Sequence, residues 1–103
     1  MSIATYQITT TNLSSVYTSA GNSAITTAYL SNTSNSPVTA NVHVVPNGAT
    51  ANVANQIYSQ LTISGYDTYV MEWERILLNN GDTIQIKAGT ASVLTVVTSF
   101  TGI

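Results

Sequence analysis

The chain has 103 residues, of which 44% are apolar and only 6% are charged, and its formal net charge is −2. Two basic residues are too few to neutralise phosphates, so the composition argues against a nucleic acid partner and against binding to an anionic membrane surface. The absence of cysteine excludes disulfides and thiolate metal sites. The length suits one compact core, and we expect residues 1–103 to form a single domain.

The polar character of the chain comes from uncharged side chains. Ser, Thr and Asn together account for 39 residues, and all six formal charges lie between positions 67 and 87. Thr, Val, Ile and Tyr favour pleated strands, whereas good helix formers are scarce. The local preference is therefore for strands throughout.

The first part of the chain is predicted to contain three strands separated by turn residues. Residues 4–11 form the first, with Tyr6 and Ile8 on one face. Residues 16–18 form a short or edge strand. Residues 24–32 are apolar on both parities, which predicts a central strand.

The clearest alternation in the first half lies between Pro37 and Pro46. Its period of two predicts a half-buried strand. Residues 49–56 have no period and are predicted to form a surface loop, and the alternative is one helical turn within residues 46–55. The inward positions of the strand are Ala40, Val42 and Val44, and the outward positions are Asn41, His43 and Val45.

Two apolar runs between residues 69 and 88 are separated by Asn79-Asn80-Gly81-Asp82. Asn-Gly supplies the two positive-φ positions of a type I′ turn, so this stretch predicts a β-hairpin. A strand before it has Ile57, Ser59, Leu61 and Ile63 on one face, and a last strand over residues 92–100 has Leu94, Val96 and Phe100 in the core.

These segments make seven or eight short strands at a spacing of roughly ten residues, which is typical of sandwiches and jelly rolls. The sequence therefore predicts an all-β, antiparallel β-sandwich, either Ig-like or jelly-roll-like. We find no internal repeat and no linker.

Ionisable side chains offer few candidates for catalysis. His43 is the single histidine, so one chain holds no His-based triad or multi-histidine metal site, and we expect a surface or interface side chain there. Asp82 is expected to complete its turn rather than to bind calcium. We expect no cofactor and no metal.

Glu72 and Glu74 stand two residues apart, which places both carboxylates on one face of a strand. Paired carboxylates are the groups that hydrolyse glycosides. The alternative is an exposed or interface strand whose charge is balanced by Arg75, or by Lys87 on the paired hairpin strand. We favour this alternative and expect the protein not to be an enzyme.

Aromatic residues gather around the same strand, since Trp73 follows Tyr58, Tyr66 and Tyr69. Such side chains stack on sugar rings or fill a partner's pocket, because the ring packs while the polar tip stays wet. Core packing is the alternative for at least two of them.

Four segments carry a resemblance to a known group of proteins. They are Ile-Leu-Leu-Asn-Asn-Gly-Asp-Thr-Ile-Gln at 76–85, Tyr-Asp-Thr-Tyr-Val at 66–70, Tyr-Thr-Ser-Ala-Gly-Asn-Ser-Ala-Ile at 17–25 and Val-His-Val-Val-Pro at 42–46. With these segments the chain resembles small, cyanophage-like virion structural proteins of tailed bacteriophages.

The resemblance implies an all-β sandwich that attaches to a larger particle and carries no catalytic residues. We expect a capsid decoration or cement protein that stabilises the assembled head. The alternatives are a tail, neck or baseplate component, or a glycan- or receptor-binding module on a tail fibre. Expected partners are the major capsid protein or other virion proteins and further copies of the chain, with a trimer favoured.

The expected location is the virion, after synthesis in the bacterial cytoplasm. The residues expected to make contacts in this setting are Tyr66, Tyr69, Trp73 and Arg75.

Overall fold

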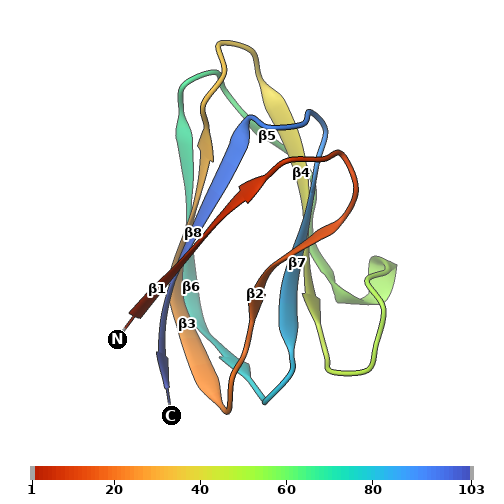
Figure 1. The fold of residues 1–103 in the computed structure, drawn as a ribbon, viewed down its shortest axis with the longest axis vertical. Coiled ribbons are helices and arrows are strands. Elements are labelled where there is room, and N and C mark those ends of the chain that lie inside the picture. Colours follow the sequence, from red (N-terminus) through yellow and green to blue (C-terminus); the bar gives the residue numbers. More distant parts are fainter. Residues whose placement is uncertain (1, 103) are drawn as a thin grey trace.

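The computed structural model of the protein describes residues 2–102, without the side chains of residues 72–75. Two four-stranded antiparallel sheets pack face to face (Figure 1). This arrangement confirms the predicted all-β sandwich. The elements are β1 (Ser2–Ile8), β2 (Ser14–Thr18), β3 (Ser23–Asn32), β4 (Val38–Val45), the 3₁₀ helix η1 (Val53–Asn55), β5 (Gln56–Ile63), β6 (Thr68–Leu78), β7 (Thr83–Ala88) and β8 (Leu94–Gly102).

The strand order identifies the type of sandwich. Sheet A has the order β1-β8-β3-β6 and sheet B the order β2-β7-β4-β5. Strand β1 pairs with β8, β2 with β7, β3 with β6 and β4 with β5. The chain is thus one long antiparallel ribbon, turned back at β4–β5 and rolled up so that its successive pairs alternate between the sheets. This is the topology of a jelly roll rather than of an Ig-like sandwich.

The predicted hairpin around Asn80-Gly81 is wrong, because β6 and β7 lie in different sheets. The Asp82 amide donates to the Asn79 carbonyl (3.1 Å), and of the two central residues only Gly81 has a positive φ, of 87°. That combination is a type II turn, which does not match the twist of a hairpin. The turn is held from outside, since Gly81 N donates to Ser19 O (2.9 Å) and Ser19 N to Asp82 O (2.9 Å).

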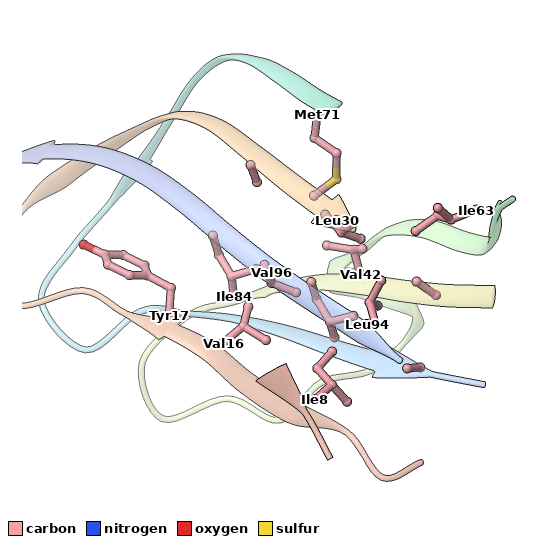
Figure 2. Packing of buried hydrophobic residues seen from close by; sticks show 14 of the residues in the cluster. Ile8, Val16, Tyr17, Leu30, Val42, Ile63, Met71, Ile84, Leu94 and Val96 are labelled. Atoms are coloured by element: carbon pink, nitrogen blue, oxygen red, sulfur yellow. The ribbon is translucent and has the colours of Figure 1, made fainter. Parts of the chain in front are cut away.

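The core lies between the two sheets (Figure 2). The inward side predicted for β4 is confirmed, because Ala40 and Val42 are buried and Val44 packs against the cluster. The predicted outward position of Val45 is wrong, because this side chain is only 1% exposed. The core positions predicted for the last strand are confirmed, because Leu94 and Val96 are buried and Phe100 packs against the cluster. Strand β3 is central, as predicted, between β8 and β6. Large core side chains that are almost fully buried are Ile8, Ile25, Leu30, Met71, Ile84, Ile86, Leu94 and Val96.

Strand β5 departs from its predicted pattern at a β-bulge. Gln60 has a φ of 55°, and the ladder to β4 shifts between the pairs Ala40–Leu61 and Val42–Tyr58. The extra residue reverses the parity of the strand, because side chains alternate with a period of two. Tyr58 and Leu61 therefore pack against the core, whereas Ile57 is exposed.

Each sheet has two edge strands, and three of the four carry a feature that discourages pairing with another chain. Strands β2 and β5 contain bulges, and β6 carries charged residues and a shift in its ladder to β3. Strand β1 is uncharged, lacks proline and runs in one register along β8. An edge of this kind is a ready template for a further strand.

Candidate binding surface

Strand β6 lies at the border of a surface that is open to a partner. It is an edge of sheet A, so its outward residues belong to the outer face of that sheet. Three of the four predicted contact residues, Tyr69, Trp73 and Arg75, lie on this strand. The side chains of Trp73 and Arg75 fall outside the described residues, and their predicted role stays a prediction.

The outer face of sheet A carries a continuous row of uncharged side chains. The strand registers place Thr5 beside Val97, Val97 beside Tyr29 and Tyr29 beside Val70. Their neighbours Leu30, Met71 and Val96 point into the core, so the row faces outward. Tyr29 is 41% exposed and Val70 43% exposed. We call Thr5, Val97, Tyr29 and Val70 the apolar row.

The row next to the apolar row is also uncharged. It contains Gln7, Thr95, Ser31 and Thr68, which pair across the four strands. Thr68 Oγ1 donates to Ser31 Oγ (3.3 Å). Hydroxyl groups of this kind supply hydrogen bonds to a partner without the cost of desolvating an ion.

Tyr58 and Tyr69 meet where the edges of the two sheets approach each other. Their rings are in a T-shaped arrangement, with centroids 5.8 Å apart. Both side chains are half-buried and pack against the core cluster. The pKa of Tyr69 is raised above its ordinary value, first by a side-chain hydrogen bond with Tyr58 and then by its partial burial. Core packing, the alternative given for two of the aromatic residues, therefore describes this pair.

Tyr66 lies apart from the tyrosine pair, in the loop between β5 and β6. Its side chain is 75% exposed, its φ is 56°, and its amide donates to Ser34 O (2.8 Å). Stacking on a sugar needs an exposed ring face, and Tyr66 is much more exposed than the half-buried Tyr69. The structure thus brings Tyr58 and Tyr69 together, whereas the side chain of Trp73 lies outside the described residues.

The predicted charge balance across a hairpin is wrong. Strand β7 pairs with β2 and β4, so Lys87 lies opposite Asn41 and not beside β6. The side chains of Glu72 and Glu74 are outside the described residues. Their backbone lies where the β6 ladder shifts, between the pairs Thr27–Glu72 and Ile25–Ile76.

His43 is predicted to be a surface or interface side chain. The surface position is wrong, and the interface role stays a prediction. His43 points away from the core, but the loop between β4 and β5 folds over it and leaves it only 9% exposed. Its Nδ1 lies 3.1 Å from Asn52 O and 3.1 Å from Asn55 Oδ1, which are both acceptors, so Nδ1 carries a proton. The helix η1 supplies the second acceptor and realises the helical-turn alternative for this loop.

Asp82 completes its turn, as predicted. Its Oδ2 accepts from Asn79 N (2.9 Å), and its Oδ1 accepts from Asn47 N (2.8 Å) in the neighbouring loop. The carboxylate therefore ties the β6–β7 turn to the loop that follows β4. Both oxygens are engaged in structural hydrogen bonds.

In residues 2–102 no helix has the length and apolarity needed to cross a membrane. Nor do the described side chains bring three His, Cys, Asp or Glu residues together in a way that could hold a metal ion. Comparisons of the chain with protein-family models, with curated proteins and with solved structures found no match.

The sequence did not point to the apolar row. Tyr29, Val70 and Val97 come from three strands and become neighbours only through the order of strands in sheet A. The available signal was local: in β8 the outward residues are Thr95, Val97 and Ser99, which are polar or small rather than charged.

Proposed function

We propose that the protein is a non-enzymatic structural component of a phage virion that decorates the assembled head and stabilises it. The observation that carries the proposal is the outer face of sheet A, where an apolar row and an uncharged polar row lie side by side. The jelly roll agrees with this role because viral capsid domains use the same architecture. Fold alone does not assign function, so the proposal rests on the outer face of sheet A.

The two uncharged rows suit a permanent contact with a protein lattice. Charged groups lose their hydration when they enter an interface, and imperfect pairing leaves that cost unrecovered. Apolar groups and hydroxyls avoid it. A protein that binds only the assembled lattice stabilises the lattice by mass action, and several linked copies raise each other's effective concentration.

The first test places one carboxylate in the apolar row. We expect Val70→Asp to weaken binding to purified heads on the order of a hundredfold, since an unpaired charge buried in an interface costs roughly 2–5 kcal/mol. Co-sedimentation with heads that lack the protein gives the affinity. Circular dichroism of the free variant checks that it is folded.

Ser15→Asp is the matched control, because Ser15 is exposed on the outer side of sheet B, opposite Gln85. Wild-type binding by Val70→Asp, or a loss confined to Ser15→Asp, contradicts the proposal. Immunogold labelling of intact particles tests the location. Gold confined to the tail supports the tail, neck or baseplate alternative, and binding to a glycan array supports a receptor-binding module.

We also propose that the protein acts as a symmetric homo-oligomer, with a trimer favoured, and that the β1 edge of each copy contacts the next copy head-to-tail, because two β1 edges that pair with each other close a dimer rather than a trimer. Ile3 on this edge is 66% exposed, and nothing in Ser2–Ile8 blocks the addition of a strand. We expect Ile3→Lys to lower the mass measured by light scattering to that of a monomer. Val53→Lys, at an 86% exposed aliphatic position on η1, should leave the mass unchanged. A monomeric wild type, or equal masses for both variants, contradicts this contact.

A further inference from the structure

The chain contains two Asn-Gly pairs, Asn47-Gly48 and Asn80-Gly81, and both lie in the same kind of turn. In the first, Ala49 N donates to Pro46 O (3.0 Å) and Gly48 has a φ of 84°. In the second, Asp82 N donates to Asn79 O (3.1 Å) and Gly81 has a φ of 87°. The two pairs therefore share sequence and local geometry, and only their surroundings differ.

Asn-Gly is the sequence most open to spontaneous deamidation, because glycine has no side chain to hinder its backbone nitrogen. The reaction needs that nitrogen and the asparagine carboxamide to be free to approach each other. At Asn80 both groups are held: its Oδ1 accepts from Gly21 N (2.8 Å), and Gly81 N donates to Ser19 O (2.9 Å).

The corresponding groups of the first pair are not held. Within residues 2–102, the side chains of residues 72–75 excepted, neither the Asn47 carboxamide nor the Gly48 amide makes a hydrogen bond, and both residues are exposed. The backbone amide of Asn47 is fixed by Asp82 Oδ1 (2.8 Å), whereas its carboxamide makes contacts without a hydrogen bond. We infer that Asn47 is a site of spontaneous modification by succinimide formation, whereas the fold protects Asn80.

The reaction uses only water. Gly48 N loses its proton and bonds to Cγ of Asn47, the Cγ–Nδ2 bond breaks, and ammonia leaves. Water then opens the succinimide at one of its two carbonyls and gives aspartate or isoaspartate, without oxidation or reduction.

The aspartate or isoaspartate formed at residue 47 is expected to destabilise the turn around it. The Asn47 carboxamide packs against Gly81, where a Cβ built on the glycine would lie 2.7 Å from Asn47 Cγ. The new carboxylate therefore forms close to the Asp82 carboxylate, and like charges repel. Isoaspartate also lengthens the backbone and disturbs the bond from the residue 47 amide to Asp82. Modification thus loosens the link between the β6–β7 turn and the loop after β4.

The test is to incubate the folded, full chain at mildly alkaline pH and to follow both sites by peptide mapping. We expect the mass change from –NH₂ to –OH at Asn47, with residue 80 at least tenfold slower. In denaturant the two rates should converge, because the difference comes from the fold. Equal rates in the folded protein, a faster reaction at Asn80, or reaction at neither site while the unfolded chain reacts at both, would each overturn the inference.

Two variants test the consequence. Asn47→Asp mimics one product and is expected to lower the melting temperature, with part of the loss recovered at high salt. Asn47→Gln keeps the residue neutral, reacts slowly because its ring is larger, and should melt within a degree or two of the wild type. If both variants melt like the wild type, the predicted coupling to Asp82 is wrong. Peptide mapping alone then decides whether Asn47 is modified.

Discussion

Replacing Asn32 by leucine is expected to destabilise the protein by about 4 kcal/mol, a large part of a typical folding free energy. Asn32 is 1% exposed at the end of β3. Its Nδ2 donates to the carbonyls of Ser36 (2.7 Å), Ile63 (3.1 Å) and Ser64 (3.2 Å), and its Oδ1 accepts from Ser34 N (3.0 Å) and Ser34 Oγ (2.8 Å). Leucine has a similar size but leaves these groups without a partner. Urea denaturation followed by circular dichroism measures the loss.

Asn32→Asp separates hydrogen bonding from shape. The carboxylate keeps the acceptor for Ser34 but turns a second oxygen toward three carbonyl oxygens, so it should destabilise at least as much at neutral pH and less at acid pH, where the protonated acid donates. Asn22→Leu, at an exposed position before β3, should cost less than about 0.5 kcal/mol. A wild-type denaturation midpoint for Asn32→Leu would show that the side chain does not hold the loops.

Gly65→Ala is expected to destabilise by about 2 to 3 kcal/mol or more, because there is no room for the added methyl group. A Cβ at this position would lie 2.5 Å from Asn35 O and 2.6 Å from Asn35 C. These are backbone atoms, which cannot turn aside as the end of a side chain can. The β3–β4 and β5–β6 loops would have to separate, at the junction where Tyr66 N donates to Ser34 O (2.8 Å).

Gly102→Ala is the control for the same chemical change, since a Cβ there meets nothing within 4 Å. Thermal denaturation should place it within a few degrees of the wild type, well above Gly65→Ala. If Gly65→Ala melts with the control, then the loops move apart more easily than their hydrogen bonds suggest.

The parts of the fold that were predictable from the sequence are those set by local periodicity. Alternation alone gave the inward side of β4 at Ala40 and Val42, and the apolar character of residues 24–32 gave the central position of β3. The fold class followed from the number and spacing of the predicted strands, together with a composition in which strand-favouring residues dominate.

The errors arose where distant parts of the chain decide the outcome. Asn80-Gly81 signals a hairpin locally, but Ser19 and Gly21 bind the turn and direct β7 into the other sheet. The bulge at Gln60 is stabilised by Asn41 on the neighbouring strand, whose Oδ1 accepts a hydrogen bond from the Gln60 amide (2.7 Å). His43 is covered by a loop that follows it in sequence, and no period in β4 reveals that cover.

The rolled ribbon also governs how the chain reaches its native state. Only the β4–β5 pair joins strands that follow one another in the sequence, and each pair further along the ribbon closes a longer segment, until β1 meets β8. Loop closure costs more entropy as the segment lengthens, so β4–β5 is the natural starting point and the rest assembles outward from it. Strand β1 is synthesised before β8, so both edges of β1 stay unpaired until β8 has been made.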